Sequence, residues 1–134
     1  MLVFFVILAF CVFFPLLWTL ITFFVSRVSG WASLAKHYKT DLPAPEHTRS
    51  LQSAIIGGAR YNGVLSIGIN TEGIYLKPFI LFSFFHPPLF IPWSDTSVKL
   101  GKYYFWDTQI IEVGKSGRIT VIRLYASQFP KLPI

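Results

Sequence analysis

The hydrophobic and polar positions divide the chain into an uncharged start and a mixed remainder. Met1–Ser26 carries no charged side chain, and Arg27 is the first charged residue. A run of about 20 apolar residues is long enough to cross the hydrocarbon core of a bilayer as a helix. The pattern therefore predicts one membrane-spanning helix over residues 1–26, with Pro15 bending it from inside.

Two other interpretations of this segment are a cleaved secretory signal and a lipoprotein signal. A cleaved signal has a basic start, a shorter apolar core and a small-x-small cleavage site. Here no basic residue precedes the apolar run, and Val28-Ser29-Gly30 is a poor cleavage match. A lipoprotein signal would use Cys11, but the bulky Phe10 stands where that motif has a small residue. We therefore favour an uncleaved anchor.

Apolar residues with helical spacing follow the anchor. They would share one face of a short amphipathic helix, and they are Trp31, Leu34, Ala35 and Tyr38. This helix and a Pro-containing connector make up residues 27–50. The apolar face could lie at lipid headgroups, with Trp31 and Tyr38 as interfacial rings and Lys36 and Lys39 reaching phosphates. Alternatively, it could pack on the domain behind it.

From residue 51 the pattern changes to short runs of β-branched and aromatic residues that turn residues separate. We expect strands at 53–61, 63–70, 74–79, 89–93, 98–106, 108–113 and 118–125. Asn70–Gly73 is typical of a hairpin turn, and Pro92 indicates an edge strand or a strand end. The sequence thus predicts an α+β, mainly β protein. Residues 51–134 would form a small antiparallel domain of six or seven strands, as a barrel or a curved sheet.

Residues 78–94 form a second uncharged stretch, which four prolines interrupt. Its uninterrupted apolar run is too short to cross a membrane as a helix, so we expect a strand, a Pro-Pro loop and another strand. Both strands could be buried in the domain core. The alternative is that Phe82, Phe84 and Phe85 form a tip in the bilayer interface, because this stretch holds more phenylalanines than one small core needs.

The distribution of charge favours one orientation and one class of partner. All 12 Lys and Arg and all six Asp and Glu follow the apolar segment, which gives residues 27–134 the net charge of +6. Basic residues close to a membrane helix favour the cytoplasmic side. We expect a single-pass protein of the cell (inner) membrane with its C-terminal domain in the cytoplasm. Anionic lipid would attract this domain, whereas the scattered basic residues argue against nucleic-acid binding.

Residues that could carry metal or catalytic chemistry are few. Cys11 is the only cysteine, so the chain has no disulfide framework and no thiolate metal site. No metal-ligand spacing joins the histidines, which are His37, His47 and His86. We interpret His86 as a loop histidine and Asp95 as a turn residue. No acid/base pair is evident among the carboxylates, and we expect no metal, no cofactor and no enzymatic activity.

Gly114-Lys115-Ser116 resembles the end of a phosphate-binding loop. That motif requires a glycine five residues before Gly114, where this chain has Gln109. Its flanks also predict strands on both sides. We therefore retain Lys115 and Arg118 only as a basic turn that could contact a phosphate headgroup.

Three segments, Gly30–Tyr38, Glu72–Leu76 and His86–Asp95, resemble a group of small bacterial membrane-anchored proteins of unassigned function. Residues 60–125 also resemble bacterial pleckstrin-homology-like domains. In those domains a turn-Gly-hydrophobic-x-Leu strand leads to an Ile-Pro-Trp-Ser-acidic corner, which is Ile91–Asp95 here. The resemblance implies a binding or assembly module and assigns no functional residue.

Together these patterns predict a single-pass membrane protein whose β-domain binds a protein partner or anionic lipid headgroups at the membrane surface. The alternative is a structural subunit of a larger membrane complex, with its helix packed against other helices.

Overall fold

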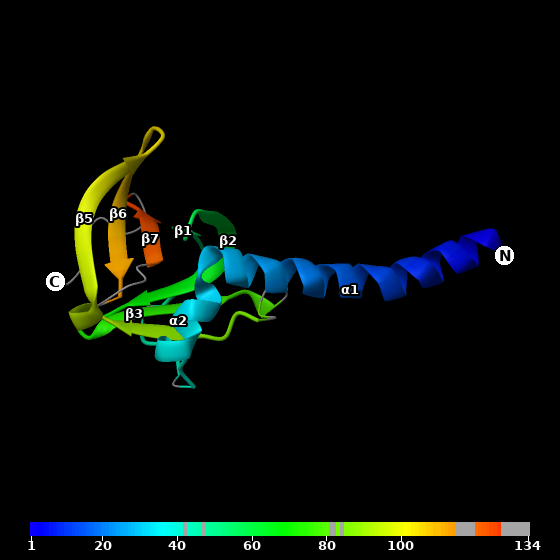
Figure 1. Cartoon of the computed structure of the whole chain (residues 1–134), viewed down its shortest axis with the longest axis horizontal. Coiled ribbons are helices and arrows are strands. Elements are labelled where there is room, and N and C mark those ends of the chain that lie inside the picture. Colours follow the sequence, from blue (N-terminus) through cyan, green and yellow to red (C-terminus); the bar gives the residue numbers. More distant parts are fainter. Residues whose placement is uncertain (42, 47, 81–82, 84, 115–119, 127–134) are drawn as a thin grey trace.

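The computed structural model places two N-terminal helices before a curled antiparallel sheet (Figure 1). The structure describes residues 1–41, 43–46, 48–80, 83, 85–114 and 120–126. Within these residues the helices are α1 (Leu2–Ser29) and α2 (Trp31–Tyr38), and the strands are β1 (Arg49–Ile56), β2 (Ala59–Ile69), β3 (Gly73–Pro78), β4 (Leu89–Pro92), β5 (Thr96–Tyr103), β6 (Trp106–Val113) and β7 (Thr120–Tyr125). The predicted α+β, mainly β architecture is confirmed.

Helix α1 is continuous over 28 residues and ends where Gly30 takes a left-handed conformation, with φ of 88°. Pro15 lies inside it, and the hydroxyl of Thr19 donates to the carbonyl oxygen of Pro15 at 2.8 Å. Of the helices in the described part of the chain, α1 alone is long and apolar enough to cross a membrane. Leu2–Leu17 is exposed throughout, so the domain covers only the C-terminal part of the helix.

The strands form one sheet in the order β4-β3-β2-β1-β7-β6-β5, and neighbouring strands are antiparallel. The last strand, β7, lies between β1 and β6, where Ala54 pairs with Leu124 and Ile56 with Ile122. It therefore joins the β1–β4 meander to the β5–β6 hairpin, and the sheet curls into a half-barrel (Figure 1). As expected from Pro92, β4 is an edge strand and ends at this proline.

Two hairpin turns fall inside segments that we predicted to be continuous strands. Residues 53–61 are interrupted at Gly57-Gly58, whose φ angles of 58° and 89° suit residues without a Cβ. Residues 98–106 are interrupted at Tyr104-Phe105, where Tyr104 has φ of 56°. The first turn has a recognisable Gly-Gly signal. The second turn contains only aromatic residues, which normally favour strands.

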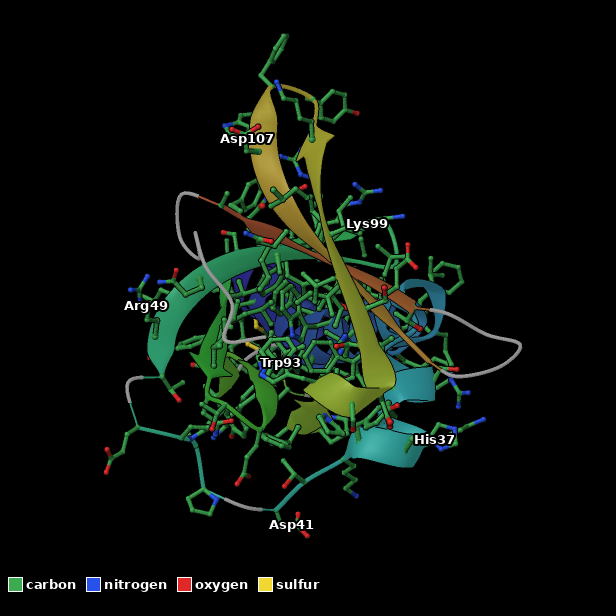
Figure 2. All side chains as sticks on the ribbon, turned by 90° about the vertical axis from the view of Figure 1, so that its left-hand side faces the viewer. His37, Asp41, Arg49, Trp93, Lys99 and Asp107 are labelled. Atoms are coloured by element: carbon green, nitrogen blue, oxygen red, sulfur yellow. The ribbon has the colours of Figure 1, made fainter. Side chains whose placement is uncertain are left out.

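The core lies between α2 and the inner face of the sheet. Trp31 is 0% exposed, and its indole Nε1 donates to the carbonyl oxygen of Pro87 at 3.0 Å. Leu34 is buried beside it, with side chains from β1 to β4, β6 and β7. Viewed from the end of the domain opposite α1, Trp93 lies within this central cluster (Figure 2). The stripe of α2 therefore packs on the domain, which is the second of the two alternatives for this helix, and Trp31 is enclosed in the core. Its position relative to lipid headgroups stays a prediction.

Candidate functional site at the junction of helix α1 and the sheet

Helix α1 meets the sheet through small hydroxyl side chains. Thr22, Ser26 and Ser29 are buried, and their spacing places them on one face of the helix. The hydroxyl of Thr22 donates to the backbone carbonyl oxygens of Trp18 and Thr19. The hydroxyl of Ser26 donates to the backbone carbonyl oxygen of Phe23 at 2.7 Å. Because the helix satisfies these two hydroxyls itself, the face is compact and the sheet approaches closely.

The β1–β2 turn is in contact with the end of α1. A Cβ on residue 57 would overlap the backbone carbonyl of Ser29, so the close approach requires a glycine at this position. Gly58, the other turn residue, has open space where its Cβ would lie. The two glycines therefore differ in role, although both have positive φ.

A buried polar network lies directly behind this contact. The hydroxyl of Tyr61 on β2 donates to Oγ of Ser29 at 2.9 Å and lies 3.0 Å from Nε2 of His86. Oγ of Ser29 also accepts the backbone N–H of Trp31 at 3.3 Å. His86 is only 2% exposed, and its ring lies against those of Trp31 and Tyr61. The network connects α1, α2, β2 and the loop before β4.

Burial keeps the tyrosine of this network uncharged. It raises the pKa of Tyr61 above its ordinary value of 10.0, because the phenolate would lose its hydration, and the hydrogen bond with Ser29 offsets part of this shift. Tyr61 is therefore a neutral phenol at physiological pH.

A cavity of about 290 Å³ opens beside the network, between α1 and β2. Its apolar lining comes from Trp18, Ile21, Val25 and Val64. Its polar lining comes from Thr22, Arg60, Tyr61, Asn62 and His86. Of the described residues that line it, none is acidic. The cavity thus combines an apolar helix surface with a basic and hydrogen-bonding strand surface, which suits an amphipathic anion.

Large apolar side chains are exposed on the loop between β3 and β4, and we call Phe79, Ile80 and Phe85 the loop patch. Ile80 is 73% exposed, and the two phenylalanines are about half exposed. The loop lies on the side of the domain from which α1 leaves (Figure 1). There the ring of Phe85 packs edge-on against Phe23 of α1, with centroids 4.9 Å apart. The guanidinium of Arg27 lies over the same Phe23 ring, 5.2 Å from its centroid.

A second exposed apolar group lies at the turn of the β5–β6 hairpin. We call Tyr104, Phe105 and Trp106 the hairpin tip, and Phe105 is 94% exposed. The β5–β6 hairpin projects sideways from the sheet, with Asp107 beside its tip and His37 of α2 on the other side of the domain (Figure 2). This group was not predicted from the sequence. Its signal was a run of four aromatic residues, which cannot all face one core when side chains alternate along a strand.

The site residues predicted from the sequence that fall within the described ranges lie on separate parts of the domain. Lys36 and Lys39 are exposed on and after α2. The hydroxyl of Tyr38 donates to Oδ2 of Asp95 at 2.9 Å, and its pKa is raised by burial and by this carboxylate. Phe85 belongs to the loop patch. Four selected residues lie outside the described part of the chain, namely Phe82, Phe84, Lys115 and Arg118.

None of the residues that line the cavity was indicated as functional by the sequence, and these include His86 and Arg60. His86 has no ligand-like neighbour along the chain, and its partner Tyr61 lies 25 residues earlier.

Across the described ranges no group of three or more His, Cys, Asp or Glu is arranged to hold a metal ion.

Comparison with known proteins found no matching family model, no similar curated protein and no similar solved structure. The resemblance to pleckstrin-homology-like domains therefore stays a prediction, and the observations that bear on function are those of this chain's own geometry.

Proposed function

We propose that this chain is a single-pass membrane protein whose domain lies directly on the bilayer and binds its anionic surface. The binding face surrounds α1 and consists of the loop patch together with Arg27 and Arg60. The observation that carries the proposal is the position of the loop patch, which exposes large apolar side chains beside the apolar helix.

The free length of α1 supports direct contact between domain and lipid. Thr22 is the first buried residue of the helix. The preceding segment, Leu2–Ile21, extends about 30 Å at a rise of 1.5 Å per residue, which equals the thickness of a bilayer hydrocarbon core of about 30 Å. If this segment spans the membrane, the next helical turn reaches the headgroups where it meets the sheet. No gap then remains between the domain and the bilayer.

At that depth the loop patch and the two arginines have complementary roles. Exposed apolar side chains of this size mark a contact surface for a partner or a membrane. The patch would enter the apolar part of the interface, while Arg27 and Arg60 meet lipid phosphates. A basic residue near an anionic leaflet contributes about 1 kcal/mol of attraction. The basic residues that follow the apolar part of α1 support a position of this face at the cytoplasmic leaflet of the inner membrane, because basic flanks of membrane helices favour the cytoplasmic side.

Spin-label depth measurements on the full chain test this proposal. The chain is placed in nanodiscs that contain phosphatidylglycerol, with Cys11→Ala as the background. Labels are attached at Ile80→Cys and Phe85→Cys, with Phe105→Cys at the hairpin tip as the matched control. We expect labels at 80 and 85 to be relaxed by oxygen and protected from a water-soluble nickel chelate, and the label at 105 to show the reverse. Equal access of nickel to all three labels would refute direct contact with lipid.

The hairpin tip supports a second candidate function, that of a subunit in a larger membrane complex. The β5–β6 hairpin projects to the side of the sheet and away from α1 (Figure 1), so lipid would not cover its tip in the arrangement above. At this tip Phe105 is 94% exposed. A photo-crosslinking residue at position 105 in native membranes should then capture a discrete protein, whereas one at the exposed Lys36 should not. Crosslinking no stronger at 105 than at 36 would argue against this candidate.

A further inference from the structure

We propose that the cavity between α1 and β2 holds one anionic phospholipid, with its phosphate at Arg60 and its glycerol and first acyl carbons against Trp18, Ile21 and Val25. This inference rests on the proposed function, because the cavity lies at headgroup depth only if α1 spans the bilayer. It goes further in assigning one specific lipid site to one cavity.

The helix residues of the cavity cross the boundary between hydrocarbon and headgroups. Trp18 and Ile21 belong to the part of α1 that precedes its first buried residue, and Val25 lies one turn beyond Ile21. From Trp18 to Val25 the helix rises about 10 Å. This interval covers the ester region of a phospholipid when Ile21 lies at the edge of the hydrocarbon core. Indole rings such as that of Trp18 are favoured at this level.

The strand side of the cavity provides recognition for a phosphate. Arg60 and Asn62 both line the cavity. A guanidinium binds phosphate oxygens through paired N–H donors. No acidic side chain among the described lining residues opposes an anion. Tyr61 adds no negative charge either, since burial raises the pKa of its phenol.

The size of the cavity sets which part of a lipid it can take. A volume of about 290 Å³ is just below the range of about 300–1,000 Å³ for small-molecule sites. It therefore suits the phosphate and glycerol region, while the acyl chains continue along the exposed surface of α1. A free phosphate would leave the wall of Trp18, Ile21 and Val25 unfilled, which favours a lipid over a soluble anion.

Native mass spectrometry of the full chain, released from nanodiscs, tests the site with defined lipids. Phosphatidylglycerol is compared with phosphatidylcholine and with free glycerol phosphate. We expect one retained phosphatidylglycerol per chain. Arg60→Gln should weaken its binding about tenfold or more, because a charge-assisted hydrogen bond contributes about 1.5–3 kcal/mol. Lys102→Gln removes the same charge from β5, far from the cavity, and should leave binding unchanged.

A second pair of variants tests the apolar wall without altering charge. Ile21→Trp should fill the cavity and displace the lipid, whereas Leu20→Trp places the same ring on an exposed neighbour that does not line it. Circular dichroism melts show that each variant is folded before binding is measured.

Three results would overturn the inference. These are equal losses in Arg60→Gln and Lys102→Gln, full binding by Ile21→Trp, and glycerol phosphate binding as tightly as the lipid. The spin-label experiment distinguishes failure of this inference from failure of the proposed function. If the cavity binds no specific lipid but the labels at positions 80 and 85 lie within the bilayer interface, only this inference is refuted and the proposed function is retained.

Discussion

The hydroxyl of Tyr61 donates a hydrogen bond to Oγ of Ser29 at 2.9 Å, joining β2 to the last residue of α1. Both side chains are buried, and His86 lies on the other side of the same hydroxyl. Buried polar groups of this kind are costly to leave without partners. The direction in which α1 leaves the domain is therefore fixed by a contact inside the fold.

Tyr61→Phe should destabilise the chain by about 1–3 kcal/mol, because Ser29 and His86 would each lose a buried hydrogen-bond partner. The measurement is thermal unfolding of the detergent-solubilised full chain by circular dichroism. Tyr104→Phe removes the same hydroxyl from the exposed hairpin tip and should leave the free energy of unfolding within about 0.5 kcal/mol of the wild-type value. Equal shifts in the two variants would contradict a role for the network.

The β1–β2 turn offers a comparison between adjacent glycines. Gly57→Ala and Gly58→Ala both place a Cβ at positive φ, which costs about 1–2 kcal/mol. Only the first also pushes a Cβ into the carbonyl of Ser29. We expect Gly57→Ala to lower the melting temperature more than Gly58→Ala and to increase cleavage by protease near Gly30. The close contact would be disproved if the two variants behaved alike.

The raised pKa of Tyr61 predicts a loss of stability at alkaline pH. The pKa of this phenol is higher in the folded chain than its ordinary value of 10.0. The neutral phenol of Tyr61 therefore makes its full contribution to the free energy of unfolding below pH 10.0. This contribution is lost as the pH rises through the raised pKa of the folded state. The free energy of unfolding should therefore fall above pH 10.0 more steeply in wild type than in Tyr61→Phe. Parallel curves for the two proteins would show that Tyr61 titrates as it does in the unfolded chain.

The predicted orientation can be tested in cells with a single reactive thiol. In a Cys11→Ala background, Ser94→Cys places a thiol on an exposed position of the domain. We expect a membrane-impermeant maleimide to label it only after the inner membrane is opened. Labelling in intact spheroplasts would show that the domain lies on the outer side of the inner membrane, opposite to the predicted orientation.

The sequence predicted the elements whose patterns are local. The uncharged run indicated α1, the spacing of Trp31 and Leu34 indicated α2, and short runs of β-branched and aromatic residues indicated most strands. Turns were predicted where a polar signal exists. At Asn70 the side-chain oxygen accepts the N–H groups of Glu72 and Gly73 at 2.8 and 2.9 Å, as in an Asx turn. The turn at Tyr104-Phe105 carries no such signal, and it was missed.

The junction could not be predicted, because it depends on contacts distant in sequence. Tyr61 meets Ser29 across 32 residues, and Trp31 meets Pro87 across 56 residues. The burial of Trp31 could not be predicted from the sequence for the same reason. An amphipathic stripe next to a membrane helix fits a headgroup position as well as a core, and only the curl of the sheet provides the pocket that buries the indole.

Gly30 is the single residue between α1 and α2, and α2 begins with the fully buried Trp31. If α1 is held in a bilayer, the domain has no tether on which to swing or extend. Its height above the lipid and its rotational setting about the membrane normal then follow from the helix. Any macromolecule that binds the hairpin tip must present its own complementary surface at that fixed height, so the domain would select partners by how far they reach above the membrane as well as by their chemistry.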